Sequence, residues 1–166
     1  MAANKNELTL LNRIKTLLLA RVWDGAGAVK VFGTGSVIIS AGIPVEALGG
    51  IRTPAAWIRP GSGDHDDEDP ELIKIRFTVT VLVAVPGDHV GEHAFIGAGF
   101  TAGAPSGQGV LEIGEQVLLT ISALHRDDSI PIQSVGRGNA EGALDRETNY
   151  VGYRDYIFEA WVGTET

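Results

Sequence analysis

The sequence contains no cysteine among its 166 residues. Disulfides, thiolate metal sites, cysteine nucleophiles and redox chemistry on protein thiols are therefore excluded, and the composition fits a reducing compartment. The chain also lacks any run near the roughly eighteen uninterrupted apolar residues that a membrane span requires. Its first residues, MAANKNELTLLNRIK, are polar where a signal peptide needs an apolar core, so we expect the mature chain to begin near Met1.

Positive charge is scarce, because 13 Lys and Arg stand against 21 Asp and Glu, for a net charge of −8. The bases are scattered, which argues against a protein that grips nucleic acid through its phosphates. A content of 44% hydrophobic and 20% charged residues is typical of a globular protein, and the length predicts one domain over residues 1–166. We therefore expect a soluble acidic domain with no membrane partner.

The longest regular pattern is LIKIRFTVTVLVAV at residues 72–85. Its odd positions are all apolar and its even positions begin with Leu, Lys, Arg and Thr, which predicts a strand with one dry face. Fourteen residues at roughly 3.3 Å each would span about 46 Å, whereas strands usually have about five or six residues. We expect part of this strand to pair with something outside the protein's own core.

Two segments have the spacing of amphipathic helices, residues 6–22 and 110–124. Asn6 is a typical helix cap, and Asp24-Gly25 is a typical stop. In the second segment Gly114 weakens the helix by about 1 kcal/mol relative to alanine. Together with the strands, these helices predict an α+β fold, with a mostly antiparallel or mixed sheet, both helices packed on one face, and long hairpin loops.

Shorter strands are predicted around the long one. Residues 29–32 and 36–41 are expected to form a hairpin around Gly33-Thr34-Gly35. The remaining predictions are a strand at 55–59 closed by Pro60-Gly61, a hydrophilic loop at 61–71 that makes a hairpin with the long strand, a strand at 130–135 ending at Gly136, and a final strand within 144–162. The final strand has large residues on both faces, which predicts that it is covered twice or lies at a subunit boundary.

His89, Glu92 and His93 match the HxxEH pattern, in which a helix places two histidines on zinc and the glutamate acts as base. The match follows a Pro-Gly turn and has Gly91 at its centre, so a rigid helix is not expected there. We therefore expect a coincidental match, no catalytic residue and no bound metal. A zinc hydrolase that uses these three residues stays open as the less favoured alternative.

Negative charge is concentrated at Asp64, Asp66, Asp67, Glu68 and Asp69. Several carboxylates within reach of one another suit Ca²⁺ or Mg²⁺, but the ligand order and central glycine of an EF-hand are missing. We expect a solvated acidic loop and no cofactor, with an ion site linked to assembly as the alternative. The loop is a candidate assembly interface or channel loop, or an outer loop that keeps the protein soluble.

The order of features resembles the tail terminator, or minor tail, proteins of long-tailed bacteriophages. The resemblance rests on the overall layout and on local patterns: the segment PAAWIRP at 54–60, the helix that ends in ISAL at 121–124, and the strand YRDYIFEAWV at 153–162. It covers nearly the whole chain but contains no catalytic signature. The glycine-rich segment 92–109 is less typical of that family.

This resemblance implies a structural virion protein, not an enzyme, that forms a hexameric ring at the head-proximal end of the tail. Such a ring caps the tail tube, ends its polymerisation and meets the head connector or a head-completion protein, with DNA only as passing cargo; assembly takes place in the host bacterial cytoplasm. Subunit contacts are expected at Arg76, Thr78, Thr80, Tyr153, Arg154 and Tyr156. A head-completion protein or tail-tube subunit is the alternative within virions.

Overall fold

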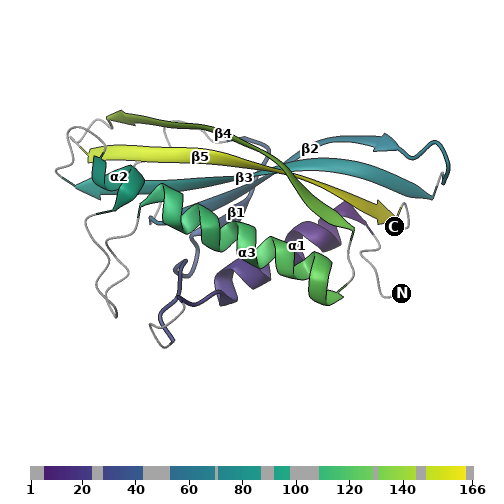
Figure 1. Ribbon diagram of the computed structural model, residues 1–166, viewed down its shortest axis with the longest axis horizontal. Coiled ribbons are helices and arrows are strands. Elements are labelled where there is room, and N and C mark those ends of the chain that lie inside the picture. Colours follow the sequence, from purple (N-terminus) through teal and green to yellow (C-terminus); the bar gives the residue numbers. More distant parts are fainter. Residues whose placement is uncertain are drawn as a thin grey trace.

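A five-stranded sheet forms one layer of the protein, and helices lie against one of its faces (Figure 1). Figure 1 shows the computed structural model, which describes residues 6–23, 28–42, 53–69, 71–86, 92–97, 109–128, 131–144 and 149–163. The predicted α+β class is confirmed. Within these residues the sheet is mixed and there are three helices, one more than the sequence predicted.

The elements follow one another as α1 (Glu7–Ala20), β1 (Val37–Ile39), β2 (Ala55–His65), β3 (Leu72–Pro86), α2 (Glu92–Ile96), α3 (Val110–Asp128), β4 (Ile132–Leu144) and β5 (Asn149–Gly163). The strands are arranged in the order β1-β2-β3-β5-β4. β1 is parallel to β2, and every other neighbouring pair is antiparallel.

β3 occupies the centre of the sheet; it begins at Leu72 as its alternation predicts and ends at Pro86, one residue beyond the predicted end. It pairs with β5 along its whole length, from Leu72 opposite Gly163 to Pro86 opposite Asn149. On its other side it pairs with β2 as far as Ile73 opposite His65. The expectation that part of this strand pairs outside the protein is therefore wrong, because a strand of equal length within the same chain matches it.

α1 begins where the sequence predicts, because Asn6 caps it: the backbone N–H of Thr9 donates to Asn6 Oδ1 at 2.9 Å. The helix ends at Ala20, before the expected stop, and Asp24 and Gly25 lie outside the described residues. α3 begins at Val110 as predicted but continues to Asp128, so His125 and Arg126 lie in its last turn.

The expected hairpin between residues 29–32 and 36–41 is wrong. Val37–Ile39 instead pairs in parallel with Ala56–Ile58 of β2, and Lys30 forms an isolated bridge with Val22. The parallel pairing places Val37 and Ile39 in the main core and Ile38 in a second apolar cluster on the opposite face. Tertiary burial on both faces of β1 thus outweighs the local turn signal of Gly33-Thr34-Gly35.

Two strands continue through residues that the sequence predicted would end them. β2 runs through Pro60-Gly61 to His65, with a register shift between Pro60 and Gly63. The backbone N–H of Ala56 points toward β1 and donates to the Ser36 carbonyl. Pro60 lies an even number of residues later, so its backbone nitrogen points to the same side, where β1 no longer pairs with β2. The N–H that proline lacks is therefore not needed for a hydrogen bond within the sheet. β4 runs past Gly136 to Leu144 with register shifts at Ser134/Gly136 and Arg137/Ala140, where bulges absorb the extra residues.

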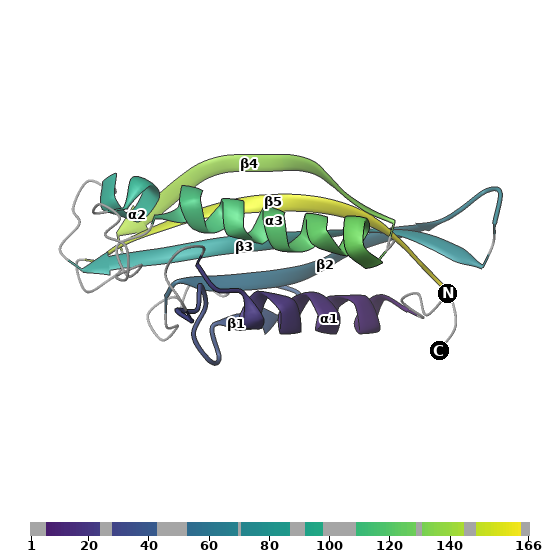
Figure 2. The same cartoon turned by 60° about the horizontal axis from the view of Figure 1, so that its bottom comes forward.

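The main core lies between the sheet and the two long helices. Buried residues of α1 and α3 belong to one apolar cluster with Phe77 of β3 and Phe158 of β5, whose rings stack with centroids 5.3 Å apart. Figure 2 shows both helices on the same side of the sheet, α1 toward β1 and α3 toward β4. Each fully buried Leu, Ile or Phe side chain contributes about 1.5–3 kcal/mol to folding, so this face supplies much of the stability.

Gly114 of α3 lies directly under the ring of Tyr156, which is fully buried. A Cβ atom at residue 114 would overlap the hydroxyl and ring carbons of Tyr156. The glycine that appears unfavourable for a helix therefore makes room for an aromatic side chain of the sheet.

We predict that Gly114→Ala destabilises the protein by about 1–3 kcal/mol because it overpacks this contact. Helix propensity alone would give the opposite sign, a stabilisation of about 1 kcal/mol. Urea unfolding of both proteins, followed by circular dichroism, measures the difference. Ser122→Ala, at an exposed position of the same helix, is the control and should change stability little; a Gly114→Ala variant more stable than the parent would contradict the packing.

Candidate functional site

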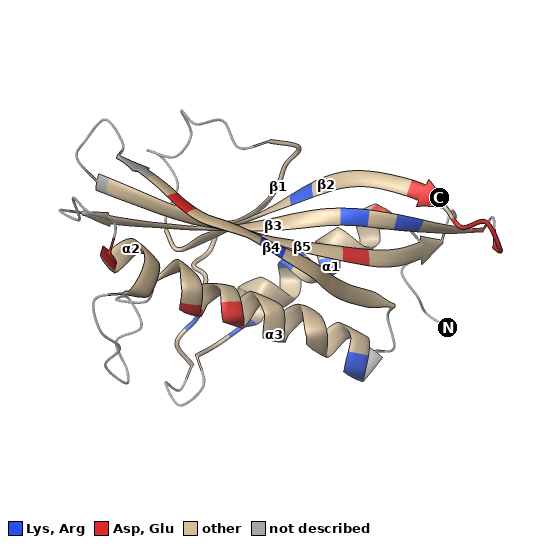
Figure 3. Cartoon of the chain, turned by 45° about the horizontal axis from the view of Figure 1, so that its top comes forward, with Lys and Arg blue, Asp and Glu red and all other residues tan. Residues whose placement is uncertain are grey.

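The face of the sheet opposite the long helices carries a row of charged side chains from β2, β3 and β5 (Figure 3). Strand alternation places them there, because residues of odd number on β5 and even number on β3 point away from the main core. At one end of this face lies a small apolar cluster formed by Ala55, Trp57, Leu82 and Val151. The charges occupy the part nearer the β2–β3 hairpin.

Glu159 is the centre of the charged row. Its Oε1 accepts from Arg76 Nη2 at 2.6 Å, and its Oε2 pairs with Lys74 Nζ at 2.9 Å, while Lys74 also lies over the ring of Trp161 at 5.4 Å. Hydrogen bonds from Arg76 and then Lys74 lower the pKa of Glu159 to about 2. One carboxylate thus holds two cations, whose side chains are 58% and 42% exposed.

A second charged pair crosses three strands. Arg59 Nη2 of β2 contacts Asp155 Oδ2 of β5 at 2.8 Å, and the hydroxyl of Thr80 on β3, which lies between them, donates to Asp155 Oδ1. These contacts link β2, β3 and β5 on the face that the helices leave open. They fit a structural role for the row, since each named group already has a partner within the chain.

The acidic cluster lies at the turn of the β2–β3 hairpin, as the sequence predicts, although Asp64 belongs to β2 itself and stands opposite Lys74. Asp66 Oδ1 accepts backbone N–H groups of Glu68 at 2.8 Å and Asp69 at 3.2 Å. Asp69 Oδ1 in turn accepts from Glu71 N–H at 3.0 Å. Two of the five carboxylates therefore shape the turn, and among the described residues no group of three or more possible metal ligands is brought together.

The six expected subunit contacts differ in their exposure. Arg76, Thr78 and Tyr153 are at least partly exposed on the open face, and the Tyr153 hydroxyl donates to Glu141 at 2.6 Å, which raises the pKa of Tyr153. Thr80 and Tyr156 are fully buried inside the protein, so their side chains offer no surface to a neighbour. Arg154 is half-buried and donates to the Gly138 carbonyl at 2.9 Å.

The HxxEH match is only partly within the described residues, because His89 lies outside them. Glu92 and His93 open the short helix α2, and both side chains are exposed. The sequence did not predict this helix, since glycines surround it. Among the described residues, Glu92 and His93 belong to no group of three or more possible metal ligands.

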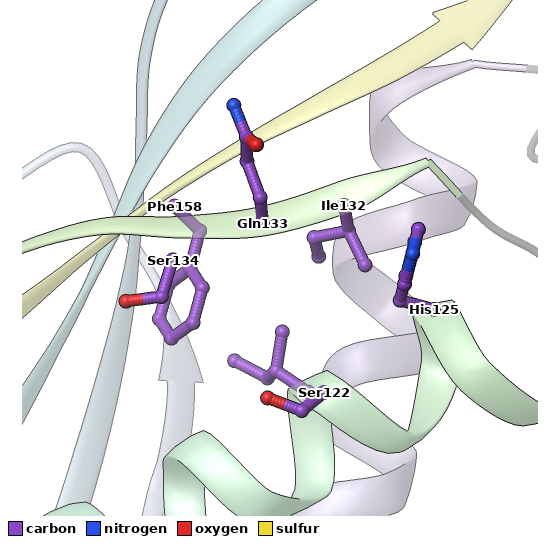
Figure 4. A pocket seen from close by; sticks show the side chains of 7 residues that line it. Ser122, His125, Ile132, Gln133, Ser134 and Phe158 are labelled. Carbon is purple, nitrogen blue, oxygen red and sulfur yellow. The ribbon is translucent and has the colours of Figure 1, made fainter.

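A small pocket of about 100 Å³ lies between α3 and β4 (Figure 4). Phe158 forms its floor, Ile121 and Ile132 its apolar walls, and Ser122, His125 and Ser134 its rim. Gln133 points to the other side of β4. Small-molecule sites usually enclose about 300–1,000 Å³, so this pocket has room for one side chain rather than for a substrate.

No protein-family model matches the chain, and no curated protein matches it significantly. Among the described helices, none has the length and apolar character needed to cross a membrane. The functional interpretation therefore rests on the surfaces and contacts of the protein itself.

We predict that Glu159→Gln reduces the loss of stability in acid. The folded-state pKa of about 2 lies below the ordinary value of about 4.3, so the charged carboxylate stabilises the fold above about pH 4.3, and this contribution disappears as the pH falls toward 2. Urea unfolding at pH 7, 5, 4, 3 and 2 should show that the stability of the variant depends less on pH than that of the parent between pH 5 and 2. The control is Glu71→Gln at an exposed position; equal slopes in Glu159→Gln and the parent would contradict the assigned cause.

Proposed function

We propose that this protein is a structural virion protein whose copies form a ring on the tail tube of a long-tailed bacteriophage. The ring ends tube polymerisation and provides the surface to which the head is joined. The proposal draws on the resemblance of layout and local patterns described above. The order of α1, the β2–β3 hairpin, α3 and β5 along the chain is consistent with that layout.

The observation that carries the proposal is the projecting β2–β3 hairpin. Every residue of β2 from Pro60 to His65 is exposed, and β1 covers the edge of β2 only at Ala56–Ile58. Figure 2 shows the hairpin reaching past the ends of α1 and α3 to the acidic turn. An arm of this kind reaches neighbouring molecules in an assembly without disturbing the core that supports it.

The charge of the arm fits a ring through which DNA passes. Repulsion between a negative wall and phosphate prevents the DNA from sticking, and carboxylates repeated around a ring add to a strong local potential. The five carboxylates at the hairpin turn supply this charge in each copy. We therefore assign the turn to the channel or to a face of the ring.

We predict that the purified protein, alone or on tail tubes of its virus, forms closed rings visible by negative-stain electron microscopy. The physical reason is that a sheet with two unlike open edges associates head to tail, and a head-to-tail contact closes into a ring when the rotation fits. Mass measurement of the same sample gives the number of copies. A protein that stays monomeric both alone and with tail tubes would rule out the ring.

We predict that a variant with Asp64, Asp66, Asp67 and Asp69 changed to Asn and Glu68 changed to Gln assembles normal tails but delivers DNA poorly. Asn keeps an Oδ1 acceptor at residues 66 and 69, so the turn is retained while its charge is removed. Tail length by electron microscopy and infectivity are the two measurements. Overlong tails would place the turn at the tube interface instead, and unchanged tails and infectivity would reduce it to a solvated surface.

The matched control removes the same amount of negative charge elsewhere. Glu92 and Glu112 are exposed and lie away from the hairpin, on α2 and α3. Changing these two to Gln, and comparing the result with a hairpin variant limited to Asp67→Asn and Glu68→Gln, separates the position of the charge from its amount.

A further inference from the structure

We propose that the β4 edge and the pocket beneath it receive the β1 edge and α1 of a second copy of this chain. This inference rests on the proposed ring and names the surfaces that meet in it. Within the described residues, no strand pairs with the outer edge of β1 or of β4. Such edges are templates for pairing with another chain.

The directions of the strands favour this contact. β1 is parallel to β2, and each step from β2 through β3 and β5 to β4 reverses direction, so β1 and β4 run in opposite directions. A second copy added beside the first, without being turned over, therefore presents β1 antiparallel to β4. Antiparallel pairing is the slightly more stable arrangement.

The widths of the two layers explain why the pocket is there. Five strands about 4.8 Å apart span about 24 Å, whereas two helices at 8–10 Å each cover at most about 20 Å. α1 lies toward β1 and α3 toward β4 (Figure 2), and the pocket lies where α3 meets β4. Phe158 is only 1% exposed, yet it lines this pocket.

In the proposed contact, α1 of the second copy covers the β4 margin of the first. α1 packs on β1 within each copy, so when β1 of the second copy pairs with β4 of the first, α1 of the second copy lies next to the pocket. Arg21, at the end of α1, reaches Gln116 of α3 at 2.9 Å, which identifies the side of α1 that faces α3 within one copy. Leu8 lies on the other flank and is 63% exposed, the most exposed large apolar side chain in the described chain. An aliphatic side chain of this size fits an apolar pocket that holds one side chain.

Bulges restrict where pairing is possible on β4. The regular ladder before the first shift covers Ile132–Ser134, three residues, and β1 is also three residues long. Beyond the shift, Arg137 is tied to Glu115 of α3 at 2.8 Å, which holds the bulged part in place. β4 therefore has two regularly paired segments, Ile132–Ser134 and Ala140–Leu144, and the first of them lines the pocket.

A two-fold contact between two β4 edges is the main competitor. It would place the β4 margins of two copies side by side. Neither copy would then bring its α1 next to the other's pocket, because α1 lies at the opposite, β1 side of the sheet. It would also close after two copies, whereas a β1 to β4 contact continues to a third. The head-to-tail arrangement is the one that covers the pocket.

The test uses the absence of cysteine from the chain. Gln133 of β4 and Ile38 of β1 both lie on the face opposite the helices, so Gln133→Cys with Ile38→Cys places two thiols on the same side of the proposed contact. Mild oxidation, and in parallel a short bismaleimide reagent that tolerates a shift in register, should give covalent multimers on a non-reducing gel. Each single variant and the pair Gln133→Cys with Thr78→Cys, on a central strand, should not.

Electron microscopy of the same samples separates this inference from the ring itself. Rings with multimers only in the Gln133→Cys, Ile38→Cys variant support it. Rings without those cross-links overturn the assignment of surfaces and leave the ring standing, whereas neither rings nor cross-links overturns both. Disulfide dimers of Gln133→Cys alone overturn it in favour of the two-fold contact.

A second variant tests the pocket. Leu8→Asp should abolish the cross-linked multimers without unfolding the protein, because the side chain is exposed and an acidic residue suits the first turn of a helix. Thr16→Asp, exposed further along the same helix, is the control and should leave the multimers unchanged. Multimers that persist in Leu8→Asp would overturn the assignment of Leu8 to the contact.

Discussion

The antiparallel ladder between β3 and β5 is the constraint on which the rest of the structure depends. Its two strands are both 15 residues long and pair without a shift in register. On one face Phe77 stacks on Phe158 in the main core, and on the other Arg76 pairs with Glu159 directly across the ladder. A slip of one residue would exchange these faces, placing charges beneath the helices and aromatic rings in water, so both faces fix the same register.

The ladder also determines what is left for assembly. Because β3 is paired with β2 and β5, and β5 lies between β3 and β4, the unpaired backbone groups of the described sheet lie mainly on β1, on β4 and on the β2 edge beyond Ile58. The two long helices cover one face. On the other face Glu159 and Asp155 form ion pairs with the basic side chains of the charged row. Within the described residues, the β4 margin with its pocket, the three-residue edge of β1 and the β2–β3 hairpin with its acidic turn stay open. Our proposals concern these three places.

The sequence predicted the elements whose patterns are long and local. The alternation of residues 72–85 and the seams of both long helices gave correct element types, because burial on one face imposes a period on the sequence. The pairing of β1 was predicted wrongly. A parallel partner distant in the sequence leaves no local pattern, whereas the Gly-Thr-Gly segment has the pattern of a hairpin turn that does not form. The charged row had a usable signal: Lys74 and Arg76 alternate on one strand as Asp155 and Glu159 alternate on another. The pocket had none, because bulges in β4 and the width of the helix layer are properties of the assembled sheet.

The acidic turn shows how a structure divides residues that look equivalent in the sequence. Asp66 and Asp69 accept backbone N–H groups of the turn, so their carboxylates are committed to its shape. Asp67 and Glu68 are exposed, and Asp64 stands opposite Lys74 on the neighbouring strand. All five carboxylates add to the negative potential around the turn, whereas two of them, Asp66 and Asp69, also define its geometry. A run of six residues thus gives a negatively charged, hydrogen-bonded turn, because some of the carboxylates that supply the charge also supply the acceptors that shape the turn.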